Sequence, residues 1–363
     1  MIVKPAHLSD LPSSGLDNVV AAETMLSHVD GTAGQLIIRG HHLAELARWS
    51  FEQVLELLWS GQTELEMSAK DIGAQLADAR VRVFELLQPQ FSMLTPVEAL
   101  RFQLAALPDA ETCPHHIMAV AAVPVFTTAI IRMKQGLEPI APDRSLSHSA
   151  DFLHMLTGVM PSVEKVQALD TYLTTVSDPG LNASTFTARV IASTDAGLFS
   201  SVIGALCALK GPLHGGAPRP VLGMLDAIGD ETNIQTWLND VLESGERLMG
   251  FGHRIYRVRD PRADVLKDAV SLLQDGSDRI VFAGKVEKAA LALLKAKKPL
   301  RSLQTNVEFY TALVLEAVGF PRDSFTNVFA AGRMAGWTAH VLEQERTGRL
   351  IRPQSRYVGP WPQ

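Results

Sequence analysis

Residues 250–262 read Gly-Phe-Gly-His-Arg-Ile-Tyr-Arg-Val-Arg-Asp-Pro-Arg, with four arginines, one histidine and two glycines in thirteen positions. Glycine lets the main chain approach a ligand closely or adopt a positive φ. Asp260-Pro261 is typical of a helix start, because Asp caps free N–H groups and Pro fits the first turn. The pattern therefore predicts a Gly-rich loop that leads into a helix and binds an anion. A solvated basic surface loop is the alternative for this stretch taken by itself.

Two further stretches lie on either side of this loop. Residues 210–217, Lys-Gly-Pro-Leu-His-Gly-Gly-Ala, place His214 in a loop of Gly and Pro. Residues 306–310, Asn-Val-Glu-Phe-Tyr, place Glu308 in an apolar, helix-forming run. In this order and spacing, the three stretches resemble the active-site motifs of the citrate synthase family. The resemblance extends from about residue 16 to about residue 360.

Composition limits the classes of function. A chain of 363 residues with 47% hydrophobic content suggests two domains with buried cores. The net charge of -6 argues against nucleic acid as the main partner, because phosphate binding needs a basic face. Cys113 and Cys207 have neither a metal spacing nor a disulfide framework, which fits a reducing compartment.

No membrane or secretory segment is expected. Residues 1–12 lack the basic-then-apolar pattern of a signal peptide. The longest apolar run, residues 117–131, is too short to span a bilayer and contains Pro124, so we interpret it as a buried core helix. The expected location is the cytoplasm.

Apolar spacing predicts an all-α protein. One small hairpin is expected over residues 27–40, with a turn at Asp30-Gly31. Helical spacing begins near Ala44 and recurs at about 69–88, 95–107, 117–134, 147–157, 163–175, 182–210 (two helices), 218–228, 231–247, 261–274, 279–296, from Asn306 onward, and 323–346. The last of these is rich in small residues and is expected to be central. The absence of βαβ alternation excludes a parallel-sheet fold.

The family resemblance implies a citrate synthase-like fold, with a large helical domain (1–216 and 320–363) and an inserted small domain (217–319). The shorter, more charged helices that follow Gly216 agree with this division. The resemblance also implies the short, homodimeric form of the enzyme.

The implied reaction is a condensation of acetyl-CoA or propionyl-CoA with oxaloacetate that releases CoA, an acyl transfer of the tricarboxylic acid cycle type (EC 2.3.3). It needs a base for the acyl methyl group and donors for the enol and ketone oxygens. By position, Glu308 would be the base. His214 would bond the thioester oxygen, and His253 would polarise the ketone.

The resemblance also implies the binding residues. Arg262 and Arg333 would bind substrate carboxylates, for which the planar guanidinium suits a bidentate pair. Arg352 matches the arginine that the partner subunit contributes. CoA, a co-substrate and not a permanent cofactor, would be held by Gly250, Phe251, Gly252, Arg257 and Arg301. No metal is expected: His41-His42 and His115-His116 are helical neighbours that point about 100° apart, without the spacing that a shared ion needs. His340 is interpreted as a packed or hydrogen-bonded residue.

Two positions depart from the family pattern. Glu308 stands where Asp is usual, so the carboxylate reaches one methylene further. Pro179, in Ser177-Asp178-Pro179-Gly180, stands where the family has a histidine that helps to bind oxaloacetate. Proline offers no side-chain hydrogen bond and no backbone donor.

Two alternatives follow from these departures. One is a catalytically impaired paralogue that acts as a ligand-binding or partner protein. The other is a condensing enzyme for a different 2-oxo acid, in which Pro179 changes specificity. His214, His253, Glu308 and the three arginines favour the working enzyme over the first alternative.

Overall fold

The computed structural model describes residues 16, 19–215, 218–253, 256, 258–273, 277–299, 301 and 303–362. These residues form a largely helical molecule with one three-stranded antiparallel sheet in the order β1-β2-β3. The strands are β1 (Ser27–Asp30), β2 (Gln35–Ile38) and β3 (His41–His42).

The helices are, in chain order, α1 (Leu43–Leu46), α2 (Phe51–Trp59), α3 (Ala69–Glu85), α4 (Pro96–Ala105), α5 (His115–Lys134), α6 (His148–Thr157), α7 (Val163–Ser177), α8 (Ala183–Ala192), α9 (Leu198–Leu209), α10 (Pro218–Ile228), α11 (Ile234–Glu243), α12 (Pro261–Ser271), α13 (Ser277–Lys297), α14 (Val307–Val318) and α15 (Phe325–Thr347). Short 3-10 turns, η2 (Glu231–Asn233) and η3 (Arg322–Ser324), lead into α11 and α15. The all-α prediction is confirmed.

Helix starts follow local capping chemistry. Ser50 caps α2 through a reciprocal pair of hydrogen bonds with Gln53, and Ser68 caps α3 in the same way with Asp71. Asp260 caps α12, and Pro261 takes the first helical position. Each of these helix starts is therefore fixed by interactions that span only three or four residues.

The predicted hairpin is present, with Ser27 opposite Ile38 and Asp30 opposite Gln35. The Asp30 carboxylate accepts hydrogen bonds from the N–H groups of Thr32 and Ala33, both at 2.8 Å, and so closes the turn. One expectation was wrong. His41 and His42 lie in the short strand β3, paired with Ile38 and Ile37, and not on a helix. The described residues contain no cluster of His, Cys, Asp and Glu that could hold a metal.

Two long helices form the centre of the core. Residues 116–131 of α5 are all buried, as the apolar run predicted. Within the described residues, α5 is the one helix long and apolar enough to cross a membrane, and 89% of its apolar window lies buried inside the protein. Helix α15 packs against α5, α7, α8 and α9, which confirms its central place.

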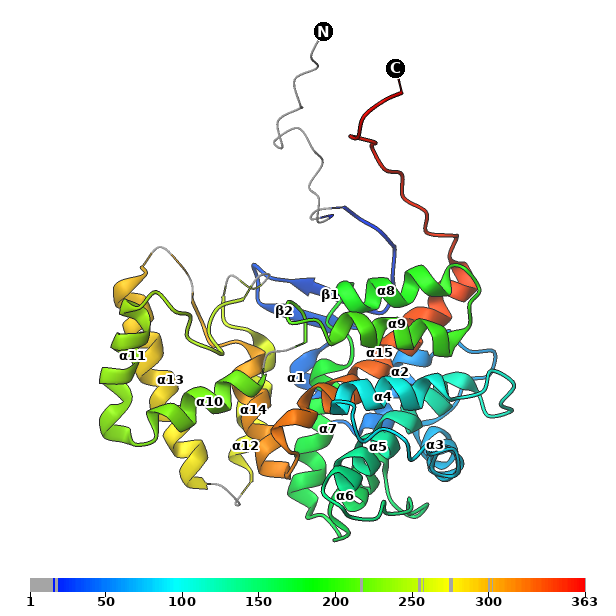
Figure 1. Cartoon of the computed structure of the whole chain (residues 1–363), viewed down its shortest axis with the longest axis horizontal. Coiled ribbons are helices and arrows are strands. Elements are labelled where there is room, and N and C mark those ends of the chain that lie inside the picture. Colours follow the sequence, from blue (N-terminus) through cyan, green and yellow to red (C-terminus); the bar gives the residue numbers. More distant parts are fainter. Residues whose placement is uncertain are drawn as a thin grey trace.

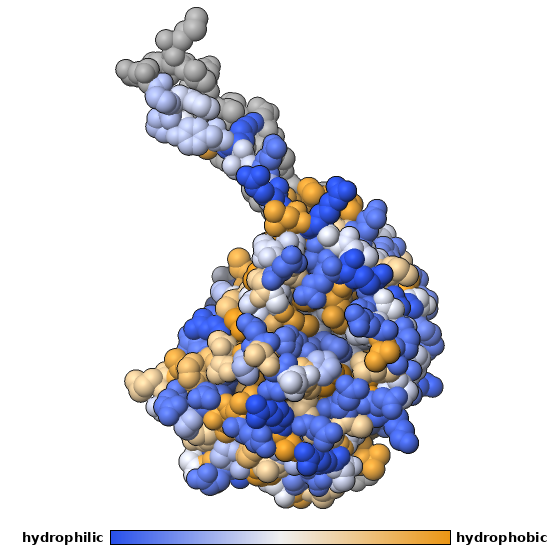
Figure 2. All heavy atoms as spheres, turned by 90° about the vertical axis from the view of Figure 1, so that its right-hand side faces the viewer, coloured by the Kyte–Doolittle hydropathy of each residue, from blue (hydrophilic) through white to orange (hydrophobic). Residues whose placement is uncertain are grey.

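Figure 1 shows how these elements are arranged. Helices α10 to α14 gather on one side, and α2 to α6 with α8 and α9 gather on the other. Helices α12 and α14 pack against α7 and so join the two groups. The tail after α15 runs away from the body, and Figure 2 shows it projecting above a surface that mixes hydrophilic and hydrophobic side chains.

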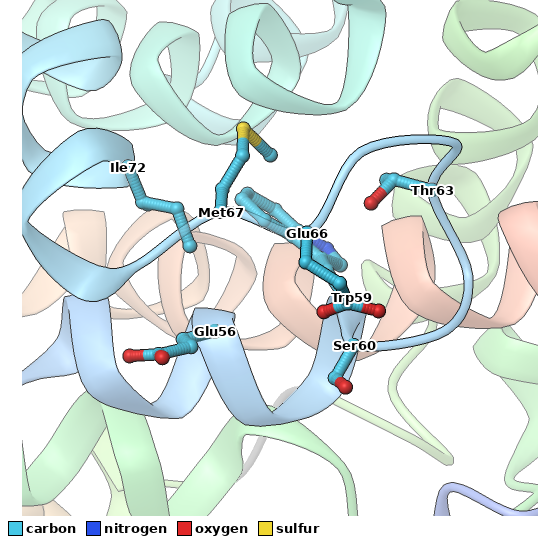
Figure 3. A pocket seen from close by; sticks show the side chains of 7 residues that line it. All are labelled: Glu56, Trp59, Ser60, Thr63, Glu66, Met67 and Ile72. Atoms are coloured by element: carbon cyan, nitrogen blue, oxygen red, sulfur yellow. The ribbon is translucent and has the colours of Figure 1, made fainter.

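A recess beside α2 is part of the packing and not a ligand site. Figure 3 shows Trp59, Met67 and Ile72 converging there from α2, α3 and the loop between them. The recess leaves no space for a water molecule. The Trp59 indole N–H donates to Thr338 Oγ1 at 3.0 Å, so the ring is fixed against α15.

Candidate active site

The Gly-rich loop lies directly beside the segment that leads into α14. Gly252 N donates to Gln304 O at 2.7 Å, and Asn306 N donates to Gly250 O at 2.9 Å. Phe251 and Thr305 form an antiparallel bridge between these two bonds. Gly250 has φ +83°, and a Cβ there would lie 2.9 Å from the Phe309 ring. The backbone therefore holds the histidine loop next to the helix that carries Glu308.

Asp260 fixes Arg262 and ties it to α14. Its carboxylate accepts from Arg262 Nε at 3.0 Å and from a terminal Arg262 nitrogen at 2.9 Å. The same carboxylate accepts from Val307 N at 3.1 Å. Arg262 is only 8% exposed, so one carboxylate orients a buried guanidinium and links the start of α12 with the start of α14.

His253 lies between two hydrogen-bond donors. A terminal nitrogen of Arg262 is 3.0 Å from His253 Nε2, and Tyr256 N is 3.0 Å from Nδ1. Burial, followed by the charge of Arg262, lowers the pKa of His253 to about 4, although Asp260 opposes this change. The imidazole is therefore neutral at pH 7. A neutral imidazole has a single lone pair, so it can accept from only one of the two donors at a time.

His214 is held by a serine thirty positions away in sequence. His214 Nε2 lies 2.8 Å from Ser184 Oγ. That hydroxyl donates to Asn182 Oδ1 at 2.8 Å and accepts from the Trp337 indole N–H at 3.2 Å. Burial, and after it the charge of Arg333, lowers the pKa of His214 to about 4. His214 is thus a second neutral, oriented imidazole.

Glu308 occupies the first turn of α14. Its N–H donates to Asn306 Oδ1 at 3.0 Å, and the Asn306 side-chain amide donates to Gly252 O at 2.9 Å. Burial raises the pKa of Glu308, and Asp260 adds to the increase, whereas Arg262 opposes it. A carboxylate with a raised pKa is a stronger base when ionised.

Arg333 is a buried cation that lacks a full set of partners. Its side chain is 2% exposed, and its Nε donates to Val176 O at 2.6 Å. One terminal nitrogen, NH1, has no hydrogen-bond partner among the described residues. Burial lowers the pKa of Arg333 to about 9, so it is charged at pH 7. The unpartnered nitrogen needs a hydrogen-bond acceptor, which a substrate carboxylate would supply.

Electrostatics join these side chains into one site. In addition to the effect of burial, the charge of Arg333 lowers the pKa of His214. The charge of Arg262 lowers the pKa values of His253, Glu308 and Arg333. Two arginines, two neutral histidines and one basic carboxylate therefore share a region between α7, α12, α14 and α15. The arrangement can bind a dianion and move a proton beside it.

The remaining predicted residues are placed differently. Arg257 lies outside the described residues. Arg301 is exposed, and its N–H donates to Lys298 O at 3.0 Å. Arg352 is exposed in the tail beyond α15, which leaves the body of this chain in Figure 1.

Sequence reasoning assigned no site role to two further residues. Ser184 orients His214, and Asp260 orients Arg262 besides capping α12. The Asp-Pro-Arg pattern could have indicated that Asp260 binds Arg262, because the two residues lie only two positions apart in sequence. No local pattern indicates the Ser184–His214 contact.

Comparisons with known proteins identify the family. The family model for the citrate synthase C-terminal domain matches residues 15–354. The chain is 37% identical to a citrate synthase of Haloferax volcanii, over 95% of each chain. It is 35% identical to a 2-methylcitrate synthase of Mycobacterium tuberculosis, over 95% of this chain and 90% of the relative.

Solved structures agree with this result. The citrate synthase of Thermotoga maritima superposes with a TM-score of 0.81 at 34% identity, covering 96% of both chains. A Thermoplasma acidophilum citrate synthase, solved as a ternary complex with carboxymethyl coenzyme A and oxaloacetate, gives a TM-score of 0.85 at 27% identity, and the match covers 97% of both chains. The chain belongs to the citrate synthase family, transferases that condense an acyl-CoA with oxaloacetate.

Proposed function

We propose that this protein condenses acetyl-CoA or propionyl-CoA with oxaloacetate, giving citrate or 2-methylcitrate and free CoA. The single observation that carries the proposal is the charge pattern of the site. Two buried arginines, one of them with an unpartnered nitrogen, lie with a carboxylate of raised pKa and two neutral histidines. Oxaloacetate is a dianion with a ketone, and it complements this pattern.

Glu308 would start the reaction as a general base. Its carboxylate takes a proton from the methyl or methylene carbon beside the thioester carbonyl, and an enol or enolate forms. Burial makes this proton transfer more favourable, because it raises the pKa of the carboxyl group.

His214 would stabilise the developing enolate oxygen. Its low pKa keeps it neutral, so it acts as a hydrogen-bond donor without consuming a proton. Ser184 holds Nε2, which leaves Nδ1 as the nitrogen that faces the thioester in this proposal. For Nδ1 to donate, the single ring proton must lie on Nδ1, so Nε2 becomes an acceptor. The Ser184 hydroxyl must then turn its hydrogen from Asn182 to His214 Nε2.

His253 would polarise the ketone of oxaloacetate, while Arg262 and Arg333 bind its carboxylates. The enol carbon then attacks the ketone carbon, and the new alkoxide takes a proton from His253, which the proton removed by Glu308 replaces. Water finally cleaves the thioester and releases CoA. The close contact between Arg262 and His253 supports a shared role at one substrate.

The CoA site and the assembly belong to the same proposal. Gly250, Phe251 and Gly252 would hold CoA together with Arg257 of the same loop and with Arg301, which lies three residues before Gln304, the residue whose carbonyl accepts from Gly252 N. A homodimer would bring the exposed tail residue Arg352 to the partner's substrate. A large domain of 1–216 and 320–363 with a small domain of 217–319 would place substrate between the two helix groups. Two unpaired cysteines suit a reducing cytoplasm.

The direct test is a matrix of acyl-CoA thioesters against 2-oxo acids, with release of free thiol as the readout. We expect turnover with oxaloacetate and with acetyl-CoA or propionyl-CoA. Their relative kcat/KM values decide between citrate and 2-methylcitrate formation. Turnover with only another 2-oxo acid would establish a changed specificity. No turnover with any pair would favour the ligand-binding paralogue.

A further inference from the structure

A chain of buried polar side chains lies behind Arg333. Asp178, His340, Arg189 and Glu343 are each at most 4% exposed. His340 Nε2 lies 3.2 Å from both carboxylate oxygens of Asp178. A terminal nitrogen of Arg189 lies 2.9 Å from His340 Nδ1 and 2.6 Å from a Glu343 oxygen. The roles proposed above use none of these four residues.

The hydrogen-bond pattern fixes the tautomer of His340. A guanidinium can only donate, so Arg189 requires a lone pair on His340 Nδ1. The ring proton of the neutral imidazole must then lie on Nε2. This proton points at the Asp178 carboxylate, which can only accept when it is ionised. Arg189 is itself held in place, because its Nε donates to Gln344 Oε1 at 3.1 Å.

Asp178 connects this chain to the substrate side of the site. It lies at the end of α7, and Gly336 of α15 packs so closely that a Cβ there would lie 3.0 Å from Asp178 Cβ. Burial opposes ionisation of Asp178, but His340, Ser27 and Arg333 together lower its pKa. In turn, Asp178 opposes the effect of burial on the pKa of Arg333. The geometry agrees, because Arg333 Nε donates at 2.6 Å to the carbonyl of Val176, two residues before Asp178, so both charged groups lie at the end of α7.

We propose that His340 is a positioning residue for substrate binding: its Nε2–H holds the Asp178 carboxylate ionised and oriented, and Asp178 keeps Arg333 charged and aligned for a substrate carboxylate. The groups that face Asp178 are His340 and Arg333 from α15 and Ser27 from β1. Arg189 of α8 contacts His340 and not Asp178 itself. Arg262 of α12 lowers the pKa of Arg333, whereas Asp178 raises it. The inference rests on the proposed role of Arg333 in binding oxaloacetate.

Glutamine and leucine separate the two possible roles of His340. Glutamine has an amide N–H that can donate to Asp178 and a carbonyl that can accept from Arg189. Leucine fills similar space but offers neither group. His340→Leu should weaken oxaloacetate binding about ten- to a hundredfold, the usual effect of losing a hydrogen bond to a charged group. His340→Gln should stay within about threefold of wild type. The KM for acyl-CoA should change little in both variants.

His148→Leu is the matched control. His148 is also a fully buried histidine, but neither of its ring nitrogens has a hydrogen-bond partner among the described residues, and it stacks on Phe51. This variant should lower Tm, because it changes a buried side chain, but should leave oxaloacetate affinity unchanged. A purely structural role for His340 predicts that both leucine variants behave alike.

The dependence of binding on pH gives a second readout. Without the Nε2–H donor, the pKa of Asp178 rises, so Asp178 becomes neutral at a higher pH. As the solution is acidified, His340→Leu should therefore lose its affinity for oxaloacetate at a higher pH than wild type does. Folded His340→Leu with wild-type affinity and an unchanged pH profile would overturn the inference.

The outcomes distinguish this inference from the proposed function. Calorimetry on the wild-type protein comes first, and failure to bind oxaloacetate would overturn the proposed function. Should His340→Leu fail to fold, nitrogen-15 spectra of histidine-labelled wild-type protein decide the matter. They should show His340 as the neutral Nε2–H tautomer at pH 7. A neutral Nδ1–H tautomer would overturn the role of His340, whether or not oxaloacetate binds.

Discussion

Glu308 is the residue on which the chemistry depends most directly. Glu308→Gln keeps the side-chain shape but removes the base, so kcat should fall about 10²–10⁴-fold. Glu308→Asp withdraws the carboxylate by one methylene, and a displacement of about 1 Å can cost about a hundredfold. Thiol release measures both variants. Glu316→Gln, on the same helix but in half-buried ion pairs with Arg322 and Arg279, is the control and should keep kcat. A Glu308→Gln variant with wild-type kcat would exclude this base.

The same carboxylate should determine the acid limb of the pH profile. The base must be ionised, so kcat/KM falls as pH decreases through its pKa. Burial raises that pKa above the ordinary value of 4.5. His214 and His253, with pKa values of about 4, are already neutral there and add no limb near neutrality. Rates measured across pH should decline at a pH above 4.5. A rate that stays constant down to that pH would contradict the assignment.

Pro179 offers a test by gain of function. A histidine there could supply the missing donor, so Pro179→His should lower the KM for oxaloacetate about ten- to a hundredfold. Neighbouring groups do not replace it: Asn182 bonds Ser184 and Thr185, and Ser184 bonds His214. Pro142→His, at another half-buried loop proline, is the control. An unchanged KM in well-folded Pro179→His, judged by Tm, would mean that the turn directs the imidazole elsewhere.

At the scale of elements, the loop 250–252 positions the site through its backbone. Gly250→Ala would strain a residue with φ +83° and place Cβ 2.9 Å from Phe309, next to Glu308. We expect a stability loss above about 1 kcal/mol and a lower kcat. Gly223→Ala in α10 has open space around it and a helical φ, so it should gain about 0.5–1 kcal/mol. Thermal melts with thiol-release assays test the pair. A Gly250→Ala protein with the Tm of wild type would show that the loop tolerates a side chain at this position.

At the scale of the whole molecule, the tail argues for a dimer. Arg352 is exposed and lies five residues beyond the end of α15, directly after Ile351, whose N–H donates to Ser193 Oγ at 3.0 Å. Arg352→Ala and His253→Ala proteins should each be nearly inactive. After mixing and reassembly, one site of each mixed dimer would combine an intact His253 with the partner's intact Arg352. Activity should return to about a quarter of wild type, because half of the dimers are mixed. If Arg352 serves its own chain, every site keeps one lesion and mixing restores nothing.

The sequence by itself determined the elements and the chemical types of the site. Capping and apolar spacing act over three or four residues, so Asp260 indicated the start of α12 without tertiary information, and Ser50 and Ser68 cap α2 and α3 through equally local bonds. The motifs around His214, His253 and Glu308 indicated the family for the same reason, since each is a short continuous stretch. The reading of His41-His42 as helical failed because strand pairing with β2 overrode the local pattern.

Only the tertiary structure decided how those side chains are oriented and charged. His214 depends on Ser184, thirty positions away, and His340 meets Asp178 across 162 positions. Arg333 lies against the end of α7, where its Nε bonds Val176 across 157 positions. These contacts arise when α15 packs between α7 and α8, and no local pattern encodes that packing. Burial then sets the pKa values, because the cost of a charge depends on the solvent and partners that the whole fold leaves to it.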